Sequence, residues 1–144
     1  MARVTRFELD LKTAQALIAV AVQTAADNDA LVSVAVVDGG GHLIAFARMD
    51  GAEIAGPRLA TDKAYTAVAH RAATADLQEL VAPGGELAGM YAADAGRYVC
   101  FPGGHPLWSE ERVVGGVGVS GGTAEQDAAC ARSAHMLFDD LSRT

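Results

Sequence analysis

The sequence predicts an α+β domain in which helices pack on a mostly antiparallel sheet. Two observations lead to this prediction. A short glycine-rich turn between two apolar segments indicates a β-hairpin, and apolar residues at helical spacing mark a long helix near each end of the chain. The 144 residues fit a single domain, 1–144, that can bury a core without disulfides or a structural metal.

The first half of the chain is predicted to form a helix, a hairpin and a second helix. Asp10 can accept backbone N–H groups at the start of the first helix, and Asn28-Asp29 can end it. The run Asp38-Gly39-Gly40-Gly41 is typical of a hairpin turn, and Pro57 suits the first turn of a helix. The expected elements are a helix over Leu11–Ala26, strands over Leu31–Val37 and His42–Met49, and a helix over Pro57–Ala73.

The second half is predicted to end in a glycine-bearing strand that leads into a long helix. Thr74 fits an N-cap, Pro102–Pro106 is expected to be a loop, and Thr123-Ala124-Glu125-Gln126 forms a capping box. Glu125 and Asp127 suit the positive end of the last helix dipole. The expected elements are helices over Thr74–Leu80 and Glu86–Ala93, strands over Arg97–Phe101 and Arg112–Ser120, and a final helix with an apolar stripe at Ala131, Ala134, Leu137, Phe138 and Leu141.

Composition excludes several classes of partner. A net charge of -7 argues against nucleic acid and anionic membrane, because both repel an acidic surface. No segment approaches the ~20 apolar residues that span a bilayer, and no uninterrupted apolar segment marks a signal peptide. Cys100 and Cys130 match no zinc spacing and form no CxxC motif, so we expect two reduced, buried thiols. The sequence therefore predicts a cytoplasmic protein.

The segment Arg112–Asp127, RVVGGVGVSGGTAEQD, is the most informative part of the chain. Glycine has no Cβ, so a ligand can approach a glycine-bearing strand closely, and we expect small-molecule contacts at Gly118. The N–H groups of Ser120-Gly121-Gly122 precede a helix and form a candidate anion site, with a tight strand-to-helix connection as the alternative. The segment also spells G-x-G-x-x-G, but only one helix follows, so we set a dinucleotide fold aside.

Two groups of polar residues are candidates for chemistry. Lys63, Thr66 and His70 share one face of the second helix, which fits either a pocket wall where Lys63 meets an anion or a solvated face. In the loop Gly103-Gly104-His105-Pro106, His105 can act as an acid/base or as a ligand for iron, or can simply be solvated. No H-x-x-x-H or HExxH motif exists, so no protein-built metal site is expected.

Several motifs occur in an order that is typical of one family. They are VVDGGGHLIAFARMDGA from Val36, KAYTA from Lys63, T-x-x-L from Thr74, FPGG-x-PL from Phe101 and GGVGVSGGTAEQD from Gly115. Over about Leu9–Leu141 the chain resembles the GlcG/HbpS-like family, which includes the C-terminal domain of PduO-type proteins. The resemblance implies a profilin-like fold, with a central antiparallel sheet flanked by helices, and a homo-oligomer between tetramer and octamer.

The resemblance also implies haem as the candidate cofactor, because several members of the family bind it. Haem-binding relatives of the PduO type carry a histidine in the first helix, and this chain has none between Leu9 and Ala30. His105 stands where the family more often has an apolar residue, and His70 stands where an aromatic residue is common. If iron is bound, these two imidazoles are the available ligands.

Two hypotheses of function remain open. In the first, the protein is a small-molecule-binding homo-oligomer, with haem as the candidate ligand and Gly103, Gly104, His70 and Thr66 among the binding residues. In the second, which follows relatives that act as cofactor-free lyases on hydroxylamino-aromatic acids, the protein is a lyase or isomerase. Lys63 and the Ser120–Thr123 amides would then hold a carboxylate, and His105 would move a proton.

Overall fold

The chain folds as a four-stranded antiparallel sheet with helices on both faces, in a computed structural model that describes residues 1–144. The elements are α1 (Leu11–Asp27), β1 (Ser33–Asp38), β2 (Leu43–Arg48), α2 (Gly56–His70), α3 (Thr74–Val81), the 3-10 turns η1 (Met90–Ala92) and η2 (Asp94–Gly96), β3 (Gly104–Ser109), β4 (Arg112–Ser120) and α4 (Ala124–Ser142). The strand order is β2-β1-β4-β3, and each neighbouring pair is antiparallel. The α+β prediction is confirmed.

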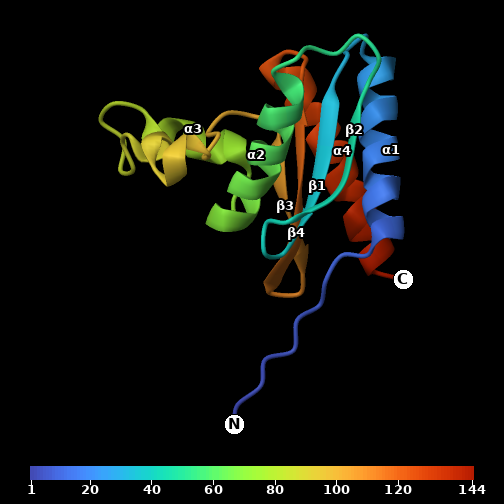
Figure 1. Cartoon of the computed structure of the whole chain (residues 1–144), viewed down its shortest axis with the longest axis vertical. Helices are drawn as coiled ribbons and strands as arrows, with labels where there is room; N and C mark the ends of the chain where they lie inside the picture. The colour runs from blue at the N-terminus through green and yellow to red at the C-terminus, as the bar shows by residue number, and fades with distance from the viewer.

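The three long helices lie on opposite sides of this sheet. α2 covers one face, while α1 and α4 lie side by side on the other (Figure 1). The expected caps hold both terminal helices: the Asp10 carboxylate accepts the Thr13 N–H at 2.8 Å, and Thr123 and Gln126 form the full capping box. No helix of the chain combines the length and the apolar character needed to cross a membrane.

The main core lies between the sheet and the α1/α4 pair. Alternate residues of a strand point to opposite faces, so β1 and β4 each have a row of valines that faces these helices. The sides of α1 and α4 that face the sheet carry mostly small side chains, so these helices approach the sheet closely. The buried residues at this interface include Val34, Val36, Val117 and Val119 from the strands, and Ala14, Leu17, Ala21, Cys130, Ala134 and Phe138 from the helices.

The other face of β4 is glycine, and α2 lies directly on it. A Cβ at Gly118 would overlap the carbonyl oxygen of Ala60, and one at Gly116 would come within 2.7 Å of the carbonyl oxygen of Ala64. The close approach that the sequence predicted therefore exists, but a helix backbone makes it. The space in front of Gly118 is filled by α2 within the subunit.

The strand expected at Arg97–Phe101 is wrong. The fourth strand of the sheet is β3, which contains part of the segment Pro102–Pro106 that we expected to be a loop. Pro106 fits there because β3 is an edge strand, where a missing N–H costs no ladder bond on the open side. The segment Arg97–Phe101 runs along α2 instead, where the Val99 N–H donates to the Thr66 hydroxyl at 2.9 Å.

Two helix boundaries also differ from the prediction. α2 ends at His70 rather than Ala73, and Ala73, not Thr74, is the N-cap of α3. The Thr74 hydroxyl instead accepts the Gly104 N–H at 2.8 Å, so it is used by β3. The helix expected over Glu86–Ala93 is reduced to the single turn η1.

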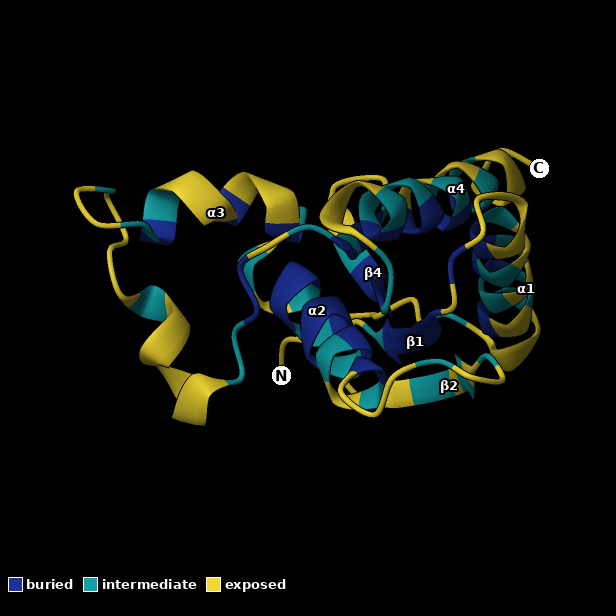
Figure 2. Ribbon diagram, turned by 90° about the horizontal axis from the view of Figure 1, so that it is seen from above, coloured by how far each residue is buried: buried dark blue, intermediate teal, exposed yellow.

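The part of the chain from α3 to η2 projects from the body of the protein. Figure 2 shows α3 and the following turns to one side of the sheet, with most of their surface exposed. A small cluster of Leu77, Val81 and Cys100 holds this part together, separately from the main core. The projecting part therefore contributes little to the packing of the sheet.

We predict that Gly118→Ala lowers the free energy of unfolding by about 3 kcal/mol or more, because the new methyl group would collide with a helix backbone that cannot move independently. Urea unfolding measures the change. Gly40→Ala is the matched control, since its methyl group would meet only side chains, the His42 ring and the Asp38 carboxylate. Equal stability of the two variants would show that α2 does not lie on β4 as described.

Candidate functional site

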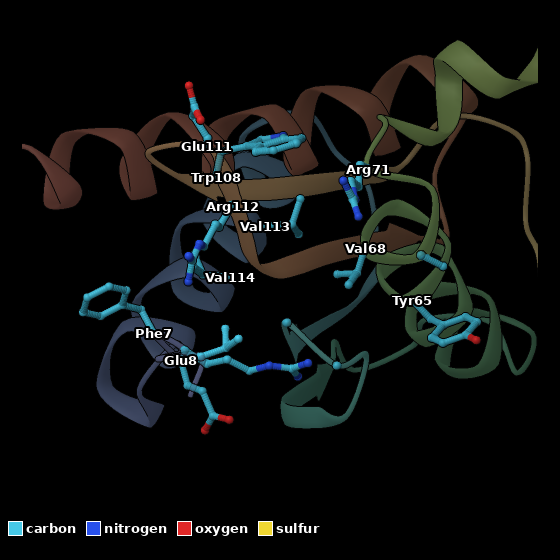
Figure 3. A pocket seen from close by; sticks show the side chains of 15 residues that line it. Phe7, Glu8, Tyr65, Val68, Arg71, Trp108, Glu111, Arg112, Val113 and Val114 are labelled. Atoms are coloured by element: carbon cyan, nitrogen blue, oxygen red, sulfur yellow. The ribbon is translucent and has the colours of Figure 1, made fainter. Parts of the chain in front are cut away.

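A cavity of about 500 Å³ opens at one end of the sheet, on the α2 side. Four separate parts of the chain form its walls: residues 4–8 before α1, the Gly39-Gly40 turn, the C-terminal half of α2 and the β3–β4 hairpin. Figure 3 shows Trp108 and Val113 of the hairpin facing Val68 and Arg71 of α2. This size is within the range of small-molecule pockets in proteins.

Arg112, which lines the cavity, also holds the N-terminal segment in place. The Arg112 guanidinium donates through Nη1 to the carbonyl oxygen of Thr5 at 2.7 Å. On the opposite wall, the Tyr65 hydroxyl donates to Asp94 at 2.9 Å, and the Arg97 guanidinium lies 3.4 Å from the centroid of the Tyr65 ring. These contacts hold the N-terminal segment and the Tyr65 side chain in place at the cavity.

His105 lies on the other face of the sheet, towards α4. Its ring stacks on that of His135, with centroids 4.0 Å apart and planes 24° apart. Its Nδ1 lies 3.1 Å from the carbonyl oxygen of Pro106, and a carbonyl can only accept, so Nδ1 carries the proton and Nε2 has a free lone pair. His135 is held in turn by Asp139, whose Oδ2 is 3.3 Å from Nε2.

Burial lowers the pKa of His105, and the neighbouring His135 lowers it further. The His105 imidazole is therefore neutral at physiological pH. A neutral imidazole with a free Nε2 is the form that ligates a metal. The sequence identified His105 but gave no reason to pair it with His135, because the two residues are on different elements.

His70 is placed less favourably for ligand contact. Its Nε2 is buried without a hydrogen-bond partner, and its ring packs edge-on against Tyr98, with centroids 4.5 Å apart. A buried Nε2 is not accessible to a metal unless the surrounding side chains move. His70 is thus on α2 as expected but is separated from His105 by the sheet.

Lys63 is fully buried rather than exposed to a pocket. Its ammonium group donates to the carbonyl oxygen of Val119 at 2.9 Å and to Oδ2 of Asp127 at 3.2 Å, and lies 5.0 Å from the Phe101 ring centroid. Burial lowers the pKa of Lys63, while the charge of Asp127 opposes this shift. The ammonium group therefore joins α2 to β4 and α4, and its donors are directed into the protein.

The remaining residues predicted on this helix face and in the loop have local partners. The Thr66 hydroxyl donates to the carbonyl oxygen of Asp62 at 2.6 Å and accepts the Val99 N–H. Gly103, with φ of 129°, and Gly104 both allow β3 to approach Lys63 without a Cβ in the way. Lys63, Thr66, Gly103, Gly104 and Gly118 thus meet at the buried contact between α2 and the sheet.

In the turn from β4 into α4, side chains at the start of α4 accept the backbone N–H groups. The Gly122 N–H donates to Oδ1 of Asp127 at 2.9 Å, and the Thr123 N–H donates to the Gln126 side chain at 2.9 Å. Gly121 has a φ of 142°, as the sharp turn after Ser120 requires. The geometry of Ser120-Gly121-Gly122 is that of a tight strand-to-helix connection, the second of the two interpretations that the sequence left open.

Sequence reasoning missed the residues that line the cavity. Trp108 was absent from the candidates because its strand was expected to be a loop up to Pro106. Arg71 and Arg112 stood at the ends of predicted elements, where charged residues are ordinary. The one available signal was the single tryptophan of the chain, four positions before Arg112.

Comparison with known proteins identifies the family. The sequence model of the family described as "Haem degrading protein HbpS-like" matches residues 9–135, and the chain belongs to this family. Over 114 residues the chain is 40% identical to the corrinoid adenosyltransferase PduO of Salmonella typhimurium, covering 79% of this chain but only 34% of that protein. It is 35% identical over 116 residues to the protein GlcG of Escherichia coli, covering 81% and 84% of the two chains.

Solved structures agree with this assignment. The protein ORFY of Klebsiella pneumoniae superposes with a TM-score of 0.92 at 33% identity, covering 96% of this chain and 97% of that one. The structure of a PduOC–haem complex superposes with a TM-score of 0.87 at 36% identity, covering 90% and 94%. A double mutant of Streptomyces reticuli HbpS gives 0.83 at 30% identity, covering 95% and 94%.

We predict that Asp127→Ala lowers the free energy of unfolding by about 3 to 5 kcal/mol, because it leaves the Lys63 ammonium buried without a counter-charge. The double variant with Lys63→Met should lose less than the single variant, since no charge then remains in the core. Chemical denaturation measures both, with Asp140→Ala on the exposed side of α4 as the control. A double variant less stable than Asp127→Ala would contradict this account.

We predict that the protein without ligand loses stability on acidification partly through His105. The pKa of His105 in the folded protein lies below the ordinary 6.5. The stability contributed by its neutral form is therefore complete above pH 6.5 and is lost as the pH falls through the pKa of the folded state. Asp76, His135 and Asp139 face it and stay constant in the comparison. Urea midpoints at about pH 7.5 and about pH 5 should fall less for His105→Gln than for the parent; equal falls would refute the assignment.

Proposed function

We propose that this member of the HbpS-like family is a homo-oligomeric haem-binding protein in which His105 supplies the iron ligand. The observation that carries the proposal is the state of this imidazole: it is neutral, only partly buried, and has a free Nε2 because Nδ1 donates to the Pro106 carbonyl. The family match and the likeness to a PduOC–haem complex support haem as the ligand.

The residues present fit such a group at His105 better than elsewhere. Protein haem iron is held by histidine, cysteine, methionine or tyrosine. The cavity beside Trp108 offers only Tyr65 of these, and the Tyr65 hydroxyl already donates to Asp94. The Nε2 of His70 is buried, and its ring packs edge-on against Tyr98. Of Tyr65, His70 and His105, only His105 combines partial exposure with a free ligand atom, Nε2.

His135 and Asp139 would orient the ligand rather than bind it. Stacking against His135 restricts rotation of the His105 ring, and Asp139 fixes His135 from the next turn of α4. Haem, when bound, would supply the redox and oxygen chemistry of its iron. The chain's own part is to present one neutral nitrogen in a fixed orientation.

Assembly into an oligomer and a location in the cytoplasm complete the proposal. Several large apolar side chains are exposed on the single chain, among them Ile54 at 91% and Met136 at 60%, and a partner subunit would cover such groups. Cys100 and Cys130 are both free thiols, which suits a reducing compartment.

A haemin titration tests the proposal. We expect the parent protein to give a sharp, saturable Soret band that His105→Ala loses, since the variant lacks the proposed iron ligand. His42→Ala is the matched control, because His42 is an exposed imidazole in the β1–β2 turn, and it should keep the band, as should His70→Ala. Light scattering of the same samples should give a multiple of 14.8 kDa.

Three results would each contradict a different part of the proposal. An unchanged Soret band in His105→Ala would remove this residue as the ligand, and the absence of any specific band in the parent would remove haem itself. A mass of a single chain would remove the oligomer.

A further inference from the structure

We propose that the cavity between residues 4–8, α2 and the β3–β4 hairpin binds a small aromatic dicarboxylate. This ligand is independent of haem, because the cavity and His105 lie on opposite faces of the sheet. The proposal rests on three features of the cavity: a strained arginine, guanidinium groups without ion pairs on three walls, and an aromatic and apolar surface beside them.

The first feature is the backbone of Arg71. Arg71 ends α2 in the left-handed conformation, with φ of 51° and ψ of 41°, and the Ala72 N–H closes the turn on the Ala67 carbonyl at 3.2 Å. Helices that end in this way usually place glycine there, because a Cβ in the left-handed region is strained. The chain keeps arginine at this position, and its side chain lines the cavity.

The second feature is charge. Arg6, Arg71 and Arg112 all line the cavity, and none of them forms an ion pair, although the protein carries a net charge of -7. The two carboxylates of the lining, Glu8 and Glu111, point away from the space between Trp108 and Arg71 in Figure 3. A planar guanidinium matches a carboxylate with two parallel hydrogen bonds.

The positions of the guanidinium groups favour two carboxylates on one ligand. Arg71 comes from the end of α2 and Arg112 from the start of β4, and Figure 3 shows them on opposite sides of Val113. Arg112 uses one donor on the Thr5 carbonyl, which leaves the rest of its guanidinium available. One carboxylate at each side would satisfy both groups.

The third feature is the surface between the arginines. Trp108 pairs with Val113, next to a bulge at which β4 carries one extra residue, Val114. Its indole stands with Val68 and Val113 along the cavity. Indole and valine favour a flat aromatic ring over an aliphatic or highly hydrated anion.

Trp108 makes the test direct, because it is the only tryptophan of the chain and lines the proposed site. We expect isophthalate to change its fluorescence saturably, with an apparent Kd about tenfold or more below that of benzoate, which lacks the second carboxylate. Benzamide, which has the ring without charge, should be weaker still. No saturable response to isophthalate, or equal affinities for isophthalate and benzoate, would overturn the proposal.

A pair of glycine variants locates the site. Arg71→Gly should retain the fold, because glycine suits the left-handed turn, and should weaken isophthalate about tenfold or more while abolishing its advantage over benzoate. Asp29→Gly relieves the same conformation at the end of α1, away from the cavity, and should bind as the parent does. Unchanged isophthalate binding in Arg71→Gly would overturn the assignment.

The haem proposal is tested by a different signal and residue. Arg71→Gly should keep the haemin Soret band, while His105→Ala should keep the isophthalate response. Either proposal can therefore be disproved without affecting the other.

Discussion

The contact between α2 and β4 is the constraint on which the rest of the structure depends. Gly116 and Gly118 allow the backbone of α2 to contact the strand directly, through the carbonyl groups of Ala64 and Ala60. No side chain on β4 could fit at these two positions, so the contact depends on glycine there and on the small alanines of α2. Because α2 is held there, its far end reaches the β3–β4 hairpin and closes one wall of the cavity.

The buried Lys63 is part of this contact and fixes the position of α2 on the sheet. A lysine removed from water is unfavourable unless its charge and donors are satisfied, and Asp127 with the Val119 carbonyl does both. Since Asp127 also accepts the Gly122 N–H, one carboxylate fixes the helix, the strand end and the following turn. The polar residues that seemed suited to a ligand are thereby the residues that position the helix.

Local signals in the sequence predicted most of the fold, because they act within a few residues. The Asp10 cap, the Thr123 capping box and the first hairpin need only neighbours in the chain, and all three are confirmed. β3 was misplaced because Arg97–Phe101 has a strand-like composition, whereas Gly104–Ser109 becomes a strand only by pairing with β4. A nonlocal partner decided the outcome.

The candidate site was harder to predict for the same reason. Helical spacing correctly put Lys63 and Thr66 on one face of α2, but spacing does not say whether a face meets water or another element. The cavity is built from four segments that are distant in sequence, and Arg71 reaches it through a left-handed turn that the sequence marks with no glycine. Residues whose role depends on such assembly have no local signature.

The edge strand β3 is where the two faces of the sheet meet. Trp108 is three positions after His105, and side chains an odd number of positions apart in a strand point to opposite faces. His105 therefore contacts α4, while Trp108 lines the cavity beside α2. The backbone between them is held by its pairing with β4, whose valines and glycines divide the same two faces. A short strand at the edge of the sheet thus presents two chemically different surfaces, a neutral imidazole on one side and an indole flanked by arginines on the other.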